Sequence, residues 1–329
     1  MAYLRQFRRL TGVALVTASL ALAALPAAAQ SQQSGFSFLR IEPSARAAAL
    51  GGSYAAVYGD DINGMFYNPA LLNEGVDRQL SVSFLNHVGD VRAGMAAYGF
   101  ELGGLGQAGV GVRFLGWGDL TERDAAGEDL GSFRASDLAL TVGLAHRYDE
   151  HLLVGVNLHS MFSRVAAYNA SALAADIGVL YHSLDGAFTA SASVNNLGIT
   201  LNALGSVDDE LPLDLRVAFT RRLRYLPLLL SVTAYDLHDV DTAADEASTF
   251  GQVMNHVALG GEFQFSEGFN LRVGYNHRRH EALKIKSRLD FAGFGFGAGI
   301  KVSRLRFDYA YSSWSSFGGM HLLTLRTVI

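Results

Sequence analysis

The sequence contains no cysteine, 5 prolines among 329 residues, and charged side chains at only 17% of its positions. The lack of cysteine excludes disulfides, thiolate nucleophiles and zinc–cysteine sites. Ordinary soluble proteins carry charges on about 25% of their residues, so this chain is poor in charge. The formal net charge of −5 argues against a nucleic-acid partner. Apolar residues (50%) and glycine (36 residues) are abundant instead. Something other than water is expected to solvate much of the surface.

The first 29 residues have the pattern of a secretory signal peptide. Arg5, Arg8 and Arg9 form a basic start, residues 10–25 form an apolar run, and Ala27 to Ala29 supply a small-residue cleavage site. A retained inner-membrane anchor is the alternative. Cleavage removes three arginines and no acid, so 26 basic residues become 23 against 31 acidic ones. The mature chain is therefore expected to be exported, with a net charge of −8.

The remaining chain alternates apolar and polar residues, and no stretch of 18 consecutive apolar residues predicts a membrane helix. At 139–144, for example, Leu140, Val142 and Leu144 share one face of an extended segment. Residues 79–329 are thus predicted to form fourteen strands of barrel length. The predicted strands are 79–86, 92–101, 106–116, 132–146, 151–164, 172–183, 186–196, 213–222, 228–236, 256–265, 269–278, 290–301, 304–313 and 319–328.

Such alternation fits two all-β architectures, a soluble sandwich and a transmembrane barrel. The face opposite the apolar stripes carries small, polar and charged residues, which a sandwich would expose to water and a barrel would turn into its lumen. The export signal, the many repeats, the glycine content and aromatic strand ends such as Trp117 and Tyr181 favour a fourteen-stranded antiparallel outer-membrane barrel. The candidate lumen charges are Arg113, Asp176, Asp214, Arg216, Glu262, Arg272, Arg306 and Asp308.

Residues 30–78 do not alternate and are predicted to form an N-terminal hatch. Ser44 suits the cap of a short helix that ends at Gly51 and Gly52, and Asn68-Pro69 suits the start of another helical turn. A fourteen-stranded barrel is wide enough to leak unless something fills it. Arg46 inside this segment would need a lumen carboxylate, with Asp176, Asp214, Glu262 and Asp308 as candidates. Binding of a ligand carboxylate is the alternative role for Arg46.

Five short motifs in the predicted hatch resemble the N-terminal signature of a known family. They are Phe36-Ser-Phe-Leu39, Ser44-Ala-Arg46, Leu50-Gly51-Gly52, Asp60-Asp61-Ile62-Asn63 and Asn68-Pro69-Ala70-Leu71-Leu72. The chain thereby resembles the PorQ and PorV proteins of the type IX secretion system, which are similar to the FadL fatty-acid transporters. The first and last motifs favour the PorQ branch. The signature positions are Ser44, Ala45, Arg46, Gly51, Gly52, Asp60, Asp61, Asn63, Asn68 and Pro69.

The resemblance implies a FadL-like fourteen-stranded barrel with an N-terminal hatch in the cell outer membrane. It further implies a non-catalytic component of type IX secretion, which contacts outer-membrane lipid and anchors a PorZ-like surface protein within the cargo attachment complex. The alternative is a FadL-like transporter of hydrophobic small molecules. That alternative requires an apolar internal pocket. The residues predicted to face inward are charged or small, which argues against it.

No catalytic, cofactor or metal site is expected. Gly104-Leu-Gly106-Gln-Ala-Gly109 matches a dinucleotide motif but spans a predicted hairpin rather than a turn from strand to helix. His277 and His280 at a strand end would point to opposite faces, which favours a solvated basic loop over a metal site. The longest predicted connections, 118–131, 197–212 and 237–255, all fall on the same side of the barrel, where a surface partner would dock.

Overall fold

The computed structural model describes residues 36–86, 90–124, 126–204, 210–239, 249–285, 290–314 and 318–329. The chain divides into two units, Met1–Ser31 and Gln32–Ile329, and all described residues belong to the second. The predicted signal peptide lies outside the described residues. Within the described part, no helix is both long and apolar enough to cross a membrane.

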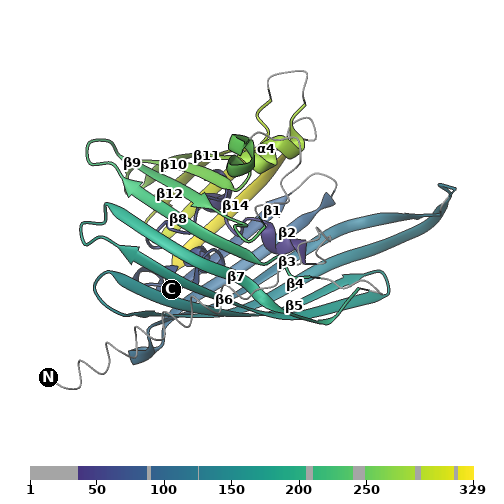
Figure 1. Cartoon of the computed structure of the whole chain (residues 1–329), viewed down its shortest axis with the longest axis horizontal. Helices are drawn as coiled ribbons and strands as arrows, with labels where there is room; N and C mark the ends of the chain where they lie inside the picture. The colour runs from purple at the N-terminus through teal and green to yellow at the C-terminus, as the bar shows by residue number, and fades with distance from the viewer. Residues whose placement is uncertain are drawn as a thin grey trace. The chain divides into compact units, whose positions relative to one another are not determined.

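Fourteen antiparallel strands of the described chain close into one barrel (Figure 1). The strands are β1 (Gln79–Asn86), β2 (Arg92–Glu101), β3 (Gln107–Arg123), β4 (Asp129–Arg147), β5 (Leu152–Val165), β6 (Tyr168–His182), β7 (Phe188–Asn202), β8 (Asp214–Arg222), β9 (Leu228–Ala234), β10 (Val257–Ser266), β11 (Phe269–Asn276), β12 (Phe294–Val302), β13 (Leu305–Ser313) and β14 (Gly319–Val328). Each strand pairs with its neighbours in sequence, and β1 pairs with β14 to close the wall. The predicted closed barrel of fourteen antiparallel strands is confirmed.

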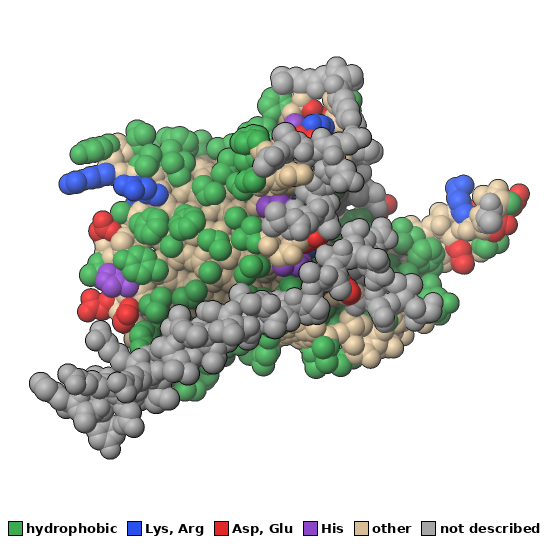
Figure 2. Space-filling view, viewed as in Figure 1, with side chains coloured by type: hydrophobic (Ala, Val, Ile, Leu, Met, Phe, Trp, Pro, Cys, Tyr) green, Lys and Arg blue, Asp and Glu red, His purple; other side chains and the backbone are tan. Residues whose placement is uncertain are grey.

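Side chains alternate across the wall as the sequence pattern predicts. On β1, Ser81 and Ser83 are buried inside, whereas Val82 and Phe84 are about half exposed on the outer face. Hydrophobic side chains cover much of the visible wall, and charged side chains gather toward its ends (Figure 2). An apolar band between charged ends is the surface that a bilayer requires of a barrel.

Short helical segments occur in the connections and before β1. They are η1 (Ser37–Arg40), α2 (Ala45–Ala49), η2 (Ile62–Phe66), η3 (Pro69–Leu71), η4 (Glu74–Val76), η6 (Gly103–Leu105), α3 (Thr249–Met254) and α4 (His277–Leu283). The first five lie in residues 36–78, here called the hatch. This segment packs against inward-facing residues of the wall, and nearly all of its side chains are buried.

The two ends of the barrel differ in the length of their connections. Short turns such as 102–106, 148–151 and 267–268 share one end with the start of β1 and the end of β14. The opposite end carries the longer connections, 203–213, 235–256 and 277–293. Barrels of this kind place short turns in the periplasm and long loops outside. We therefore call the two ends the short-turn end and the long-loop end.

Two of the predicted long connections are shortened by strands that continue into them. β3 continues to Arg123 and β4 starts at Asp129, so the 118–131 connection is mostly a paired hairpin. The apparent break at Gly116 is a bulge, because the register shifts between Gly116 and Asp119 and Gly118 has a φ of 76°. β7 likewise continues to Asn202. In the third connection, residues 240–248 lie outside the described residues and 249–254 form α3.

Candidate functional site

The α-helix of the hatch, α2, has ends that follow from its sequence. The side chain of Ser44 accepts a hydrogen bond from the backbone N–H of Ala47, which caps α2. Gly51 and Gly52 follow the helix with φ values of 66° and 84°, a left-handed conformation that favours glycine. The chain can therefore turn sharply within the barrel after one and a half helical turns.

Asparagine and aspartate side chains organise the rest of the hatch. Asp61 accepts a hydrogen bond from the backbone N–H of Asn63 at 3.1 Å and caps η2. Asn68 accepts one from Ala70 at 2.9 Å and caps η3, whose first residue is Pro69. These side chains satisfy backbone groups that would otherwise be buried without a partner. The hatch can thus be compact without long helices.

Inward-facing glycines let the hatch backbone approach the wall. A Cβ atom on Gly274 of β11 would lie 2.1 Å from the carbonyl carbon of Leu50, and one on Gly155 of β5 would lie 2.4 Å from that of Pro69. Real Cβ atoms do not make such contacts, so these positions accept only glycine while the hatch is seated. Other wall glycines in close contact with the hatch include Gly99, Gly109, Gly143, Gly178, Gly260, Gly295 and Gly297.

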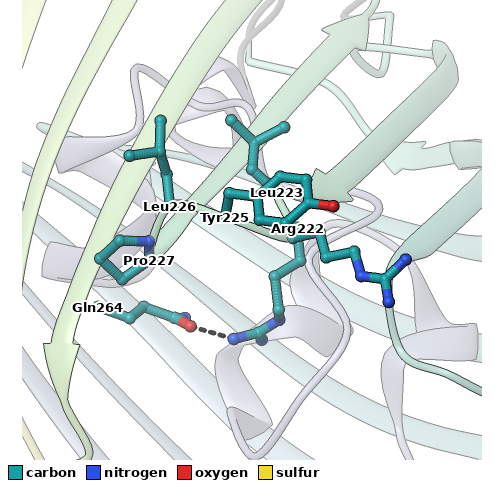
Figure 3. A pocket seen from close by; sticks show the side chains of 7 residues that line it. Arg222, Leu223, Tyr225, Leu226, Pro227 and Gln264 are labelled. Carbon is teal, nitrogen blue, oxygen red and sulfur yellow. Dashed lines mark hydrogen bonds between the residues drawn. The ribbon is translucent and has the colours of Figure 1, made fainter.

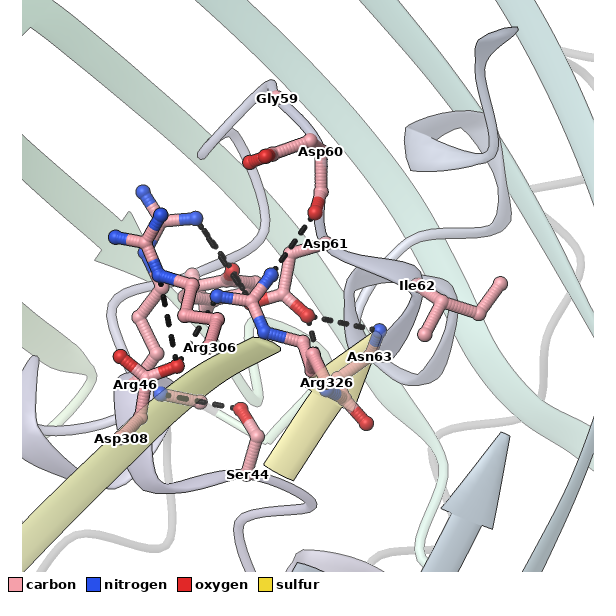
Figure 4. A network of polar contacts seen from close by, with 12 residues as sticks. Ser44, Arg46, Gly59, Asp60, Asp61, Ile62, Asn63, Arg306, Asp308 and Arg326 are labelled. Atoms are coloured by element: carbon pink, nitrogen blue, oxygen red, sulfur yellow. Dashed lines mark hydrogen bonds and ion pairs between the residues drawn. The ribbon is translucent and has the colours of Figure 1, made fainter. Parts of the chain in front are cut away.

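A buried network of charges joins the hatch to β10, β11, β13 and β14 (Figure 4). In the hatch, Arg46 Nε donates to Glu262 Oε2 at 2.9 Å. The Tyr54 hydroxyl donates to Asp61 Oδ2 at 2.6 Å. On the wall side, Arg326 Nη1 lies 3.2 Å from that same Asp61 oxygen. The predicted lumen carboxylate beside Arg46 is therefore Glu262.

The wall side of this network is also closely paired. The Asp308 carboxylate accepts hydrogen bonds from Arg272 Nη1 at 2.6 Å and from Arg326 Nη2 at 3.1 Å. Arg306 Nε lies 3.7 Å from the same carboxylate. Arg272 Nε further lies 3.4 Å from Glu262. The network thus holds four guanidinium groups (residues 46, 272, 306 and 326) and three carboxylates (residues 61, 262 and 308), a net charge of +1. Such pairing is what allows charges to remain buried.

Burial and pairing act in opposite directions on the hatch members of the network. Burial alone raises the pKa of Asp61, but the guanidinium groups of Arg326 and Arg46 and the Tyr54 hydroxyl outweigh it and hold that pKa below its ordinary value. Burial likewise lowers the pKa of Arg46, while Glu262, Tyr54 and Asp61 together raise it well above its ordinary value. Both groups are therefore charged at neutral pH.

The hatch is expected to stay seated in mild acid and to loosen only below about pH 4. A carboxyl whose pKa falls on folding stabilises the folded state above its unfolded pKa, about 3.9 for Asp. That stabilisation is lost as the pH drops through the folded pKa of Asp61, which lies lower. Pepsin digestion of purified protein between pH 5 and pH 2 measures this, with Asp61→Asn as the variant that removes the titrating group. Cleavage of the wild-type hatch at pH 5 would contradict the expectation.

A second polar cluster connects the hatch to β4, β5 and β6. His159 Nε2 lies 2.7 Å from Asp176 Oδ2, and His159 Nδ1 lies 2.9 Å from the Thr141 hydroxyl. Asn157 donates to Asp176 at 2.9 Å and to the carbonyl oxygen of Met65 in η2 at 2.8 Å. A hydroxyl, imidazole and carboxylate in series resemble a catalytic triad. Because the Thr141 side chain is buried inside the wall, the contacts to the hatch account for this cluster better than catalysis does.

The remaining predicted lumen charges also face inward and contact the hatch or its partners. Arg113 lies 4.7 Å from the Phe66 ring centre and donates to the carbonyl oxygen of Leu39 at 3.2 Å. Arg216 lies 5.1 Å from the Tyr67 ring centre and donates to Asp214 at 2.6 Å. All eight predicted lumen charges therefore face the barrel interior, where they contact the hatch or one another.

The interior toward the long-loop end is apolar. Leu85, Leu115, Met161 and Leu322 are nearly or completely buried there, on the inner sides of four different strands. Phe36, at the start of the hatch, packs in the same cluster. Other members include Phe38, Leu39, Ala93, Met95, Ala139, Ala310 and Met320, with Ile41, Val91, Trp117, Leu204, Leu211 and Trp314 partly buried against them. We call this cluster the apolar compartment.

The histidine pair lies on a helix rather than at a strand end. Asn276 accepts a hydrogen bond from the backbone N–H of Arg279 and starts α4, so His277 and His280 share a helix face with ring centres 6.3 Å apart. The expectation that they point to opposite faces is wrong. Within the described ranges, no group of three or more possible metal ligands occurs. The Gly104 to Gly109 motif lies in the hairpin between β2 and β3, as predicted.

The sequence pattern does not single out three important members of the two polar clusters. Arg326 could have been found, because Leu323 and Leu325 face outward and alternation then turns residue 326 inward. His159 has the same inward parity as Asn157. Tyr54 lies in the hatch, where no alternation exists, and only the folded chain brings it to Asp61.

Comparison with solved structures finds barrels of the same fold. The toluene transporter TodX of Pseudomonas putida aligns with a TM-score of 0.54 and 11% identity over 86% of this chain and 96% of that chain. A TodX variant with the deltaS2S3 change gives 0.58 and 11% over 87% and 99%. The CymD monoaromatic hydrocarbon channel gives 0.52 and 10% over 86% and 95%. At such identities the likeness establishes the fold alone. No protein-family model matches the sequence, and no curated protein resembles it significantly.

Proposed function

We propose that the chain is an outer-membrane channel for hydrophobic small molecules. The apolar compartment carries this proposal, because it places a cluster of buried apolar side chains inside the barrel, at the end that faces the long loops. The mixed charges that argue against a transporter in the sequence are concentrated around the hatch. The shared fold of the TodX toluene transporter and the CymD hydrocarbon channel supports the same conclusion.

Three methionines suit the compartment to small ligands of different shapes. Met95, Met161 and Met320 all line it, and methionine adapts its flexible, polarisable side chain to irregular apolar partners. Between the apolar compartment and the short-turn end, the hatch and its charges close the barrel. A hydrophobic molecule that entered from the long-loop end would be buried among apolar side chains, and the hatch would have to move before the molecule could pass to the other end. The barrel wall would keep it out of water throughout.

Uptake by cells tests this function directly. Deletion of the gene is expected to slow uptake of toluene and of long-chain fatty acid, because the intact outer leaflet is a poor path for apolar solutes. Re-expression of the wild-type chain should restore the rate. Unchanged uptake of both substrates in the deletion strain would contradict the proposal. Measuring export of type IX cargo in the same strains separates a transport defect from a secretion defect.

Phe36 occupies the compartment as a ligand would, and removing its ring is expected to create a binding site. Phe36 is fully buried, and a buried Phe→Ala change costs about 3–5 kcal/mol of stability and leaves an apolar cavity. We expect the Phe36→Ala variant to melt at a lower temperature, and toluene to restore part of the loss. The lipid-facing Phe114→Ala is the matched control. Equal toluene responses in both variants would contradict this expectation.

A surface-anchoring role in type IX secretion is the second candidate, and the β3–β4 hairpin favours it. The hairpin extends beyond both neighbours, since β2 pairs only as far as Gly116 and β5 only as far as Ala135. In this exposed part of the hairpin, β3 and β4 pair only with each other, so each strand has an outer edge whose backbone groups could pair with a partner protein. Crosslinking through residues 118–131 to a PorZ-like protein tests the role. Normal cargo export by the deletion strain would remove this candidate and leave the transport proposal intact.

A further inference from the structure

The buried network around the hatch has one more cation than it has carboxylates, and the unmatched cation is Arg306 (Figure 4). Arg46, Arg272 and Arg326 each contact two of the three carboxylates. Arg306 contacts Asp308 alone, and its Nε atom lies 3.7 Å from that carboxylate without forming a hydrogen bond. The excess positive charge of the network therefore belongs to Arg306.

Strand pairing places three cations in a row on the inner face of the wall. Arg306 of β13 lies directly opposite Arg326 of β14 on one side and Lys301 of β12 on the other. These three residues face inward, because apolar neighbours such as Leu305 face outward. Like charges directly opposite one another on paired strands are destabilising. Asp308 offsets only part of this repulsion, so the row favours a further anion.

Several buried guanidinium nitrogens beside this row have no hydrogen-bond partner in the described part of the chain. They are Arg272 Nε, Arg272 Nη2, Arg306 Nε and Arg326 Nε. The side chains of Arg272 and Arg326 are 0% and 3% exposed. Arg306 Nη2 donates to the side-chain oxygen of Asn270, which is neutral. Burial of an N–H group without an acceptor is costly. A water molecule would satisfy these donors, but only an anion would also balance the charge.

The row is open toward the short-turn end of the barrel. Lys301 lies beside the turn at 303–304 and is exposed, whereas the side chain of Arg306 is 14% exposed and that of Arg326 is almost completely buried. Exposure therefore decreases in steps along the row. An anion that entered from this end would meet Lys301 first and the unmatched guanidinium next.

We propose that Arg306, together with Arg272, Arg326 and Lys301, binds one small monovalent anion, which is chloride in the cell. The network has a single unmatched charge, which suits a monovalent ion. Because the inner donors are almost completely enclosed, a small spherical ion suits them better than a tetrahedral oxyanion with its directional oxygens. The proposal does not depend on which solute the barrel transports.

The enclosed donors exist only while the hatch is seated, so the anion is expected to stabilise the seated state. Arg326 Nη1 lies 3.2 Å from Asp61 of the hatch and donates to the carbonyl oxygen of Asp60 at 2.9 Å. When the hatch moves away, water reaches the wall arginines and hydrates them. The anion then has little reason to remain, and its binding is coupled to the position of the hatch.

Hydrogen exchange of the hatch amides in the purified protein tests the site, with sodium chloride compared against sodium gluconate at equal ionic strength. A ligand that binds only the seated state slows opening by the factor 1 + [anion]/Kd, so about 150 mM chloride should slow exchange in residues 45–72 roughly tenfold for a site with a Kd of about 15 mM. Arg306→Gln should abolish this response. Because the variant also removes the unmatched charge, its exchange in gluconate should be no faster than that of the wild type.

Arg222→Gln is the matched control. The Arg222 guanidinium donates to the neutral side chain of Gln264 at the short-turn end (Figure 3), but it is exposed and hydrated, so its charge needs no bound anion. This variant should keep the full response to chloride. Crystals soaked in sodium bromide should show an anomalous peak beside Arg306 in the wild type and none in Arg306→Gln.

A merely structural role of Arg306 makes the opposite prediction, namely faster exchange of Arg306→Gln in both salts, and that result would overturn the proposal. Equal slowing by chloride and gluconate would show general screening and overturn it as well. Tighter binding of sulfate than of chloride, or the lack of a bromide peak, would have the same consequence. A bromide peak without any effect of chloride on exchange would mean an adventitious ion only.

Discussion

In the Gly274→Val variant, the hatch is expected to be displaced from the barrel wall, and the barrel is expected to conduct ions. The new Cβ atom would lie 2.1 Å from the Leu50 carbonyl carbon and 2.2 Å from the Gly51 nitrogen. Both are backbone atoms of the hatch, so rotation of a side chain cannot relieve the overlap. Barrels wider than eight strands leave an aqueous channel when nothing fills them. Planar-bilayer recordings should show a large rise in conductance over the wild type.

The control for this variant is Gly94→Val. Gly94 also lies within a strand, β2, but a Cβ atom there would meet nothing within 4 Å. It points to the outer face, where an added apolar side chain faces lipid. Heat-modifiable mobility should be retained in both variants. If Gly274→Val left the conductance as low as Gly94→Val, the close fit of the hatch to the wall would not be what seals the barrel.

Arg46→Ala is expected to destabilise the seated hatch by about 3–5 kcal/mol, the usual cost of removing one partner from a buried ion pair. Arg46 is 6% exposed, and its loss leaves Glu262 with only the longer contact to Arg272 at 3.4 Å and removes one of the two guanidinium groups beside Asp61. Hydrogen exchange of the hatch amides measures this effect, because it reports local opening separately from unfolding of the wall. Exchange in residues 45–72 should accelerate by two orders of magnitude or more, roughly the rate equivalent of that energy.

The exposed ion pair between Arg134 and Asp119 provides the comparison. Its atoms approach to 2.7 Å, but the side chains are 84% and 65% exposed. Pairs of this kind contribute about 0–1 kcal/mol, so Arg134→Ala should leave hatch exchange unchanged. Arg46→Lys should restore only part of the protection, because an ammonium group cannot reproduce the planar contacts of a guanidinium. Full protection in Arg46→Ala would show that the network does not hold the hatch.

The strands could be predicted because alternation is a local property of the sequence. The inward direction of Glu262 and Asp308 followed from their position between outward apolar neighbours. Their partners could not be predicted in the same way. Arg46 and Glu262 are 216 residues apart, and only the folded chain brings this guanidinium to this carboxylate.

The apolar compartment was harder to foresee for a different reason. Near the long-loop end, inward residues such as Leu85 and Met161 are as apolar as their outward neighbours, so alternation of polarity disappears there. The length of the β3–β4 hairpin was obscured by Gly116 and Gly118, which read as a turn and form a bulge. Residues whose pattern departs from strict alternation therefore contain much of the information about function.

Because the hatch precedes the strands in the chain, the protein faces a problem of order during biogenesis. Helix α2 contacts β11, β12, β13 and β14, which are the last strands to be synthesised. Until these strands are present, Arg46 and the apolar side chains of the leading segment lack the wall residues that contact them in the folded barrel. Pairing of β14 with β1 and enclosure of the leading segment are then expected to occur together, so that the segment around which the last strands fold remains inside the finished barrel.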